Sequence, residues 1–103
     1  MSADRITALQ GMLASRPADA RLRFGHAVEY EKAGRIEDAV RELRVYLDQQ
    51  EDQGNAWGRL GALLSGLGRT HDARAAYGRG IEQALKHNHP SMAAELESAV
   101  ADL

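Results

Sequence analysis

The sequence predicts an all-α protein, built from two copies of a helix–turn–helix unit with one further helix at each end. Apolar residues recur at spacings of three and four, as they do on one face of a helix. Only two prolines interrupt the 103 residues. The same order of small and large residues also occurs twice, and one constant offset relates the two copies. A chain of this length suits one domain, residues 1–103.

The repeat pairs small residues with small residues, turn glycine with turn glycine and large residues with large ones. The matched pairs are Ala27 and Gly61, Gly34 and Gly68, Ala39 and Ala73, Tyr30 and Leu64, Leu43 and Tyr77, and Leu47 and Ile81. Small side chains allow two antiparallel helices to approach closely, and larger ones fill the space beside the crossing. We therefore expect a first copy at residues 20–53 and a second copy at residues 54–87.

The N-terminal helix is expected over residues 3–15, where Ile6, Leu9 and Leu13 share one face. In the first copy, Asp19 is a suitable N-cap for a helix from about Ala20 to Ala33. A glycine then provides the left-handed helix exit, and a second helix follows from about Ile36 to Gln50.

The second copy is expected to form helices from about Gly54 to Leu67 and from Thr70 to Lys86, with Thr70 as N-cap. Among its glycines, Gly61 has a packing role at the helix crossing. No packing role is evident in the sequence for Gly58, Gly66 and Gly78. A last helix over residues 90–103 begins at a proline and carries its apolar residues on one face.

Trp57, Leu60, Gly61, Ala73 and the aromatic Tyr77 stand at the spacing of the motif W-x2-L-G-x2-Y…A-x3-F…P, in which Leu64 replaces the tyrosine. This stretch resembles the tetratricopeptide repeat family, and in particular its small stand-alone bacterial members. The resemblance implies an α-solenoid fragment of two repeats, flanked by an N-terminal and a C-terminal capping helix. The first copy departs from the pattern at positions 23 and 26, where arginine and histidine replace large apolar residues.

In this family the first helix of each repeat lines a concave face that holds a peptide. Carried onto this chain, the resemblance implies a binding face of Arg21, Phe24, Val28 and Glu31 in the first copy, Asn55, Arg59, Ala62 and Ser65 in the second, and His89, Met92 and Leu96 in the end helix. Its mixture of apolar and cationic residues would suit a peptide with an apolar anchor and an acid. Phe24 and Val28 stand where lysine and asparagine would clamp a C-terminal carboxylate, so such a clamp is not expected. In the alternative interpretation Phe24 packs against the N-terminal helix and the arginines are solvated.

No arrangement of residues indicates catalysis. The serines lie outside any nucleophile elbow, and the glycine pairs do not follow a strand as a phosphate loop would. We therefore expect a protein that is not an enzyme and needs no cofactor. His87 and His89 form a pair beside a helix start, but a stable metal site needs three or four ligands. They are expected to be solvated, and no metal site is predicted.

The charge balance limits the class of partner. The net charge is −2, which gives no general electrostatic support for binding nucleic acid. No apolar run is long enough to span a membrane. The absence of cysteine fits a reducing, cytoplasmic setting, and the excess of arginine over lysine (11 to 2) indicates a GC-rich, bacterial source.

These observations predict a protein-interaction module that binds a peptide or partner segment in the concave face. The alternative is a structural homo-oligomer whose groove or end helix is occupied by another copy of the chain. Charge is spread unevenly along the sequence: the first copy carries a net −2, the second +3 and the last sixteen residues −3. This pattern favours pairing within the chain, self-association or an acidic partner.

Overall fold

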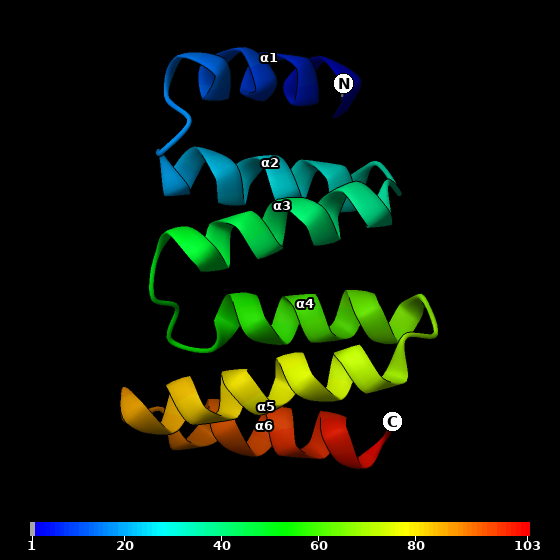
Figure 1. Ribbon diagram of the computed structural model, residues 1–103. Coiled ribbons are helices and arrows are strands. Elements are labelled where there is room, and N and C mark those ends of the chain that lie inside the picture. The colour runs from blue at the N-terminus through cyan, green and yellow to red at the C-terminus, as the bar shows by residue number, and fades with distance from the viewer. Residues whose placement is uncertain (1) are drawn as a thin grey trace. The chain divides into compact units, whose positions relative to one another are not determined.

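The computed structural model describes the backbone of residues 2–103 and the side chains from Asp4 onward. The described chain forms six helices and no strand (Figure 1), which confirms the all-α prediction. The helices are α1 (Ser2–Ser15), α2 (Ala20–Lys32), α3 (Ile36–Gln49), α4 (Asn55–Gly66), α5 (Thr70–Lys86) and α6 (Pro90–Ala101). Each predicted helix is therefore present, with its ends within two residues of the expected positions.

Three helices end in the same left-handed turn. Their exit residues, Gly34, Gly68 and Asn88, have φ angles of 77°, 76° and 61°. In each case the amide of the following residue donates to a carbonyl of the last helical turn; the pairs are Arg35 to Tyr30 at 2.9 Å, Arg69 to Leu64 at 2.9 Å and His89 to Ala84 at 2.7 Å. This geometry satisfies carbonyls that would otherwise lack a donor at the helix end.

The two predicted N-caps have different outcomes. Asp19 caps α2 as expected, because its Oδ1 accepts a hydrogen bond from the Leu22 amide at 3.1 Å. The prediction that Thr70 caps α5 is wrong. Thr70 is the first helical residue, and Arg69 stands in the cap position without a side-chain hydrogen bond to the helix. The turn at Gly68 places Arg69 at the N-cap position of α5. Thr70 already lies inside the helix, so its hydroxyl is one residue past the position from which it could cap.

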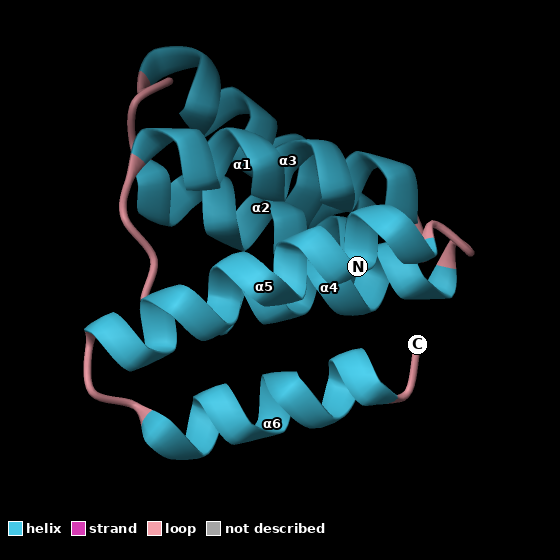
Figure 2. Cartoon of the chain, turned by 60° about the horizontal axis from the view of Figure 1, so that its bottom comes forward, coloured by secondary structure: helices cyan, strands magenta, loops and turns pink. Residues whose placement is uncertain are grey.

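The chain divides into two compact units, with the boundary between Gln50 and Glu51. In the first unit α1 packs on α2 and α2 packs on α3. In the second unit α4 packs on α5 and α5 packs on α6. Within each unit, consecutive helices run antiparallel (Figures 1 and 2), since the connecting turns are short.

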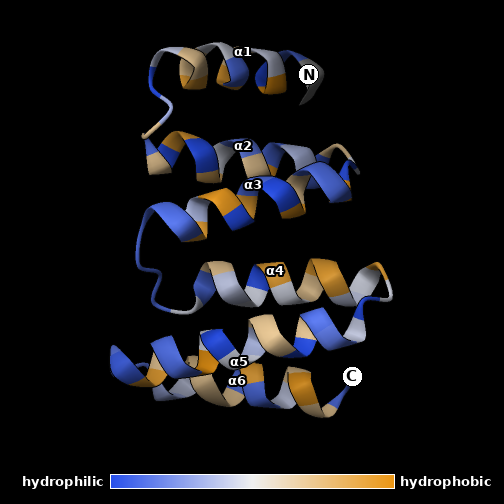
Figure 3. Ribbon diagram, viewed as in Figure 1, coloured by the Kyte–Doolittle hydropathy of each residue, from blue (hydrophilic) through white to orange (hydrophobic). Residues whose placement is uncertain are grey.

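The core of the first unit lies where α2 meets α3. Ala27 and Ala39 are almost completely buried there, as the size pattern predicts, and Tyr30 and Leu43 fill the space around them. On α3, apolar residues recur between charged ones (Figure 3), so one face of the helix can be buried while the other stays in water. Ile6 and Leu13 of α1 are also buried.

The second unit depends on a close approach of α4 and α5. A Cβ at Gly61 would lie 2.7 Å from two atoms of the Tyr77 ring, closer than real side chains come. The ring therefore lies directly on the backbone of α4. Burial in this position raises the pKa of the Tyr77 hydroxyl.

The expectation that Gly58 has no packing role is wrong. Leu96 of α6 extends between two helices of the second unit: a Cβ at Gly58 would lie 2.8 Å from its Cδ2, and one at Gly80 would lie 2.8 Å from its Cδ1. The two glycines thus form a notch that receives the leucine. By contrast, a Cβ at Gly66 or Gly78 would meet nothing within 4 Å.

A substitution to alanine should have opposite effects on stability at a glycine in close contact, such as Gly61, and at a glycine with open space around it, such as Gly78. Gly61→Ala should lower the free energy of unfolding by about 1–3 kcal/mol, because the methyl group overlaps the Tyr77 ring. Gly78→Ala, in the interior of α5 with open space around it, should raise it by up to about 1 kcal/mol through helix propensity. Urea unfolding of both variants measures the two changes. Equal effects of the two substitutions would show that the approach of α4 and α5 does not require glycine.

Candidate peptide-binding site

The residues of the predicted binding face in the first unit lie along α2. Arg21 is exposed, whereas Phe24, Val28 and Glu31 are half-buried. Their spacing of three, four and three residues places them in one row along the helix. The structure brings Arg21 and Phe24 together at the start of this row, where the end of α3 lies opposite.

At this end of the helix pair there is a hollow of about 260 Å³. Arg21 and Phe24 of α2 line it together with Tyr46 of α3 and Gln50 just beyond α3; we call it the α2–α3 hollow. The sequence identified the two lining residues on α2. It did not identify Tyr46 and Gln50, because the family resemblance directs attention to the first helix of each repeat.

The wall of the α2–α3 hollow is a pair of aromatic rings. The ring centroids of Phe24 and Tyr46 lie 5.1 Å apart, with the planes tilted by 55°. This separation is within the range of about 4.5–7 Å in which aromatic pairs attract each other. Phe24 thus packs on α3, and this contact was not part of the alternative in which it packs against the N-terminal helix.

The polar lining of the hollow consists of one cation and one amide. Among the described residues, the Arg21 side chain has neither a hydrogen bond nor an ion-pair partner, so its guanidinium donors face solvent. Gln50 Nε2 donates to the Tyr46 hydroxyl at 2.7 Å, which orients the phenol at the edge of the hollow. The site therefore offers an apolar wall beside an unpaired positive charge.

In the second unit, the predicted residues of α4 lie in less enclosed positions. Asn55, Ala62 and Ser65 are exposed, and Arg59 is half-buried. Met92 of α6 was predicted to line the face, and its sulfur packs at Gly54, where a Cβ would approach it to 2.9 Å.

The remaining predicted positions belong to α6 and the turn before it. His89 is exposed and its Nε2 lies 2.7 Å from Gln53 Oε1, while Leu96 is buried in the glycine notch. Met92 and Leu96 thus contribute to the packing of the second unit.

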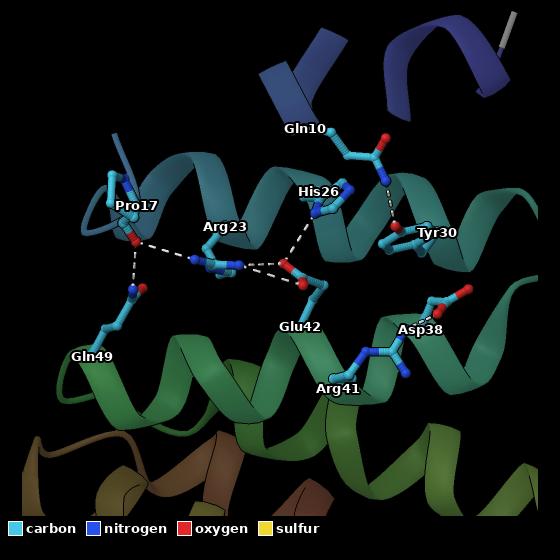
Figure 4. A network of polar contacts seen from close by, with 9 residues as sticks. All are labelled: Gln10, Pro17, Arg23, His26, Tyr30, Asp38, Arg41, Glu42 and Gln49. Carbon is cyan, nitrogen blue, oxygen red and sulfur yellow. Dashed lines mark hydrogen bonds and ion pairs between the residues drawn. The ribbon is translucent and has the colours of Figure 1, made fainter. Parts of the chain in front are cut away.

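Beside the α2–α3 hollow, a carboxylate connects the two helices (Figure 4). Glu42 Oε2 accepts from Arg23 Nη1 at 3.1 Å and lies 3.0 Å from His26 Nδ1. We call these three residues the Glu42 network. The sequence marked positions 23 and 26 as departures from the family pattern, and the structure shows that both face the same acid on α3.

Two further contacts join the network to the ends of the helices. Arg23 Nη2 donates to the Pro17 carbonyl at 3.1 Å, and Gln49 Nε2 donates to the same oxygen at 2.9 Å (Figure 4). The turn before α2 and the end of α3 are therefore linked through one carbonyl. On the other side, the His26 ring lies 4.3 Å from that of Tyr30, whose hydroxyl accepts from Gln10 of α1 at 3.0 Å.

The histidine pair after α5 is bound by side chains of the same unit. Glu51 receives Lys86 Nζ at 2.6 Å and lies 3.6 Å from His87 Nε2, and the hydrogen bond from Lys86 holds the pKa of this carboxyl below its usual value. Within the part of the chain that the structure describes, no three metal-ligating side chains come together.

The two copies differ at two of the positions that line the α2–α3 hollow. The offset that relates the copies pairs Phe24 with Gly58 and Tyr46 with Gly80. The ring pair of the first unit therefore occupies the positions that form the leucine notch in the second. This joint change of two positions is the signal that could have identified Tyr46 from the sequence.

None of the described helices is both long and apolar enough to cross a lipid bilayer.

Comparisons with known proteins support the helical-repeat fold. A family model described as tetratricopeptide repeat matches residues 1–86. The structure of PcrH in complex with the chaperone binding region of PopD is similar, with a TM-score of 0.87 at 16% identity over 98% of this chain and 77% of the other. The solution structure of BPP2914 from Bordetella parapertussis gives a TM-score of 0.78 at 28% identity over 94% and 84% of the two chains. No curated protein sequence matches.

The geometry of the Glu42 network predicts the tautomer of His26. An ionised carboxylate only accepts hydrogen bonds, so the ring nitrogen that faces Glu42 must carry the hydrogen. We expect the neutral ring to carry its hydrogen on Nδ1 and to leave Nε2 bare, which is buried without a partner among the described residues. The ring ¹⁵N chemical shifts measure this directly. A ring protonated only at Nε2 would contradict the contact.

Proposed function

The chain belongs to the tetratricopeptide repeat family, and on this premise we propose that it binds a segment of another protein through the α2–α3 hollow. The observation that carries the proposal is the aromatic wall formed by Phe24 and Tyr46 beside the exposed guanidinium of Arg21. Val28 and Glu31 continue the row along α2. In the second unit, the predicted binding residues stay a separate part of the proposal: Asn55, Arg59, Ala62, Ser65 and Met92.

The size of the hollow favours a side chain over a whole small molecule. Its volume of about 260 Å³ lies below the range of about 300–1,000 Å³ that is usual for small-molecule sites. One apolar side chain of a peptide can be covered by the two rings. The rest of the peptide would then lie along the row on α2, so affinity would be distributed over an extended surface.

The charge of the hollow favours an acidic neighbour beside this anchor. Arg21 can donate two parallel hydrogen bonds to a carboxylate, a geometry that lysine does not offer. The exposed position of Arg21 limits its contribution, since exposed ion pairs contribute about 0.2–1 kcal/mol. We therefore assign most of the affinity to the ring pair and the choice between peptides to the arginine.

The fold likeness to PcrH supports a binding role for a chain of this kind. PcrH was solved in complex with the chaperone binding region of PopD, so a closely similar fold holds a segment of another protein. For this chain we propose a segment of defined chemistry, namely an apolar residue next to an acidic one.

Two synthetic decapeptides test the proposal by fluorescence anisotropy. Both carry one leucine in a glycine–serine background, followed by aspartate in the first and lysine in the second. We expect tighter binding of the aspartate peptide. Phe24→Ala should weaken it by about 5- to 30-fold, for a loss of about 1–2 kcal/mol. Arg21→Ala should weaken it by about 1.5- to 5-fold and reduce the discrimination between the peptides.

Arg44→Ala is the matched control, because Arg44 is an exposed arginine of α3 that does not line the hollow. It should leave both affinities unchanged. Equal binding of the two peptides to all variants would contradict the proposed site. Light scattering on the free chain tests the homo-oligomer alternative: a stable dimer that Phe24→Ala converts to monomer would assign the hollow to a second copy of the chain.

A further inference from the structure

The Glu42 network occupies positions that are apolar in the other copy of the repeat. The offset between the copies pairs Arg23, His26 and Glu42 with Trp57, Leu60 and Ala76. All three positions are polar in the first unit and all three are apolar in the second. The same helix pair can thus be built with an apolar trio, so folding alone does not demand a charged one.

Burial of the network carries an energetic cost. The side chains of Arg23, His26 and Glu42 are only 18%, 5% and 12% exposed. Two of their nitrogens, Arg23 Nε and His26 Nε2, are buried without a hydrogen-bond partner among the described residues. A buried ion pair of this kind adds little stability compared with apolar side chains of similar volume. What it does provide is directional contacts.

These directional contacts fix the end of the helix pair where the hollow lies. The chain of hydrogen bonds runs from Glu42 through Arg23 to the Pro17 carbonyl and from there to Gln49. Arg23 lies between two lining residues of α2 in the sequence, and Gln49 precedes the lining residue Gln50. Tyr46 stands one helical turn after Glu42 on α3.

His26 completes the arrangement from the inner side. Its Nδ1 contacts the same carboxylate oxygen as Arg23, so Glu42 is held from two directions along α2. The Tyr30 ring lies against the imidazole, and Gln10 of α1 holds the Tyr30 hydroxyl. These contacts hold the carboxylate from both sides, and they hold α3 against this end of α2 (Figure 4).

We propose that Arg23, His26 and Glu42 are positioning residues, which set the distance between Phe24 and Tyr46 and thereby the width of the α2–α3 hollow. This inference rests on the proposed binding function, which it extends from the lining residues to the residues behind them. The network acts on the shape of the site, and an apolar trio in its place would preserve the fold while changing that shape.

Glu42→Gln tests the inference with almost no change in side-chain volume. Arg23 and His26 both donate to Glu42, but a glutamine offers one acceptor oxygen and one donor group. Arg23 Nη1 lies 3.1 Å from Glu42 Oε2 and 3.4 Å from Oε1, so the NH2 group of the glutamine faces Arg23 in either orientation, and the negative charge is lost as well. We expect the nuclear Overhauser effects between the Phe24 and Tyr46 rings to fall by half or more. We also expect the affinity for the leucine–aspartate decapeptide to fall by about fivefold or more.

The triple variant Arg23→Met, His26→Leu, Glu42→Met separates positioning from stabilisation. Its thermal midpoint should equal or exceed that of the wild type, since an apolar trio replaces a buried ion pair. Its ring contacts and peptide affinity should nevertheless be reduced as in Glu42→Gln. A purely structural network predicts the reverse, namely lower stability with unchanged binding by the folded fraction.

Arg41→Ala is the control, because it removes an ion pair with Asp38 on the same helix but outside the network. It should leave ring contacts and affinity unchanged. Ring contacts and affinity within twofold of the wild type in Glu42→Gln would overturn the inference, and so would a Glu42→Gln variant that does not fold. If the wild type binds no peptide, the proposed function fails, and the ring contacts still decide whether the network positions Phe24 against Tyr46.

Discussion

The close approach of two antiparallel helices at small residues is the constraint on which each unit depends. In the second unit the Tyr77 ring lies on the backbone of Gly61, with no room for a Cβ. In the first unit Ala27 and Ala39 are almost completely buried at the corresponding place. Once the helices are this close, the residues beside the crossing decide what each pair can do. The small residues therefore explain the fold, and their neighbours explain the differences between the units.

The two units carry different residues beside the helix crossing, with opposite results. The second is completed by its own chain, since Gly58 and Gly80 form a notch that Leu96 of α6 fills. The first places Phe24 and Tyr46 at the equivalent positions, and the rings leave a hollow with Arg21 at its edge. The Glu42 network lies beside the ring pair, and the equivalent positions of the second unit are apolar. The second unit is thus closed by its own chain, whereas the first unit leaves the α2–α3 hollow that we propose as a binding site.

The sequence predicted the helices well because their signals are local. Apolar spacing, turn glycines and the Asp19 cap act within a few residues, and the helix ends came within two residues of their expected positions. Among the local signals, the predicted cap at Thr70 was wrong. The other failures involve contacts between residues far apart in the sequence. The role of Gly58 depends on Leu96, which lies two helices further along the chain. Tyr46 and Glu42 take part in the site because α3 returns alongside α2, and spacing along one helix cannot reveal that contact.

Mapping of the bound peptide by ¹H–¹⁵N spectroscopy tests directly whether the α2–α3 hollow is the binding site. The full chain, labelled with ¹⁵N, would be titrated with the leucine–aspartate decapeptide. We expect the largest amide shifts at the residues that line the α2–α3 hollow, namely Arg21, Phe24, Tyr46 and Gln50. Largest shifts on α5 or α6, with these four amides unmoved, would contradict it.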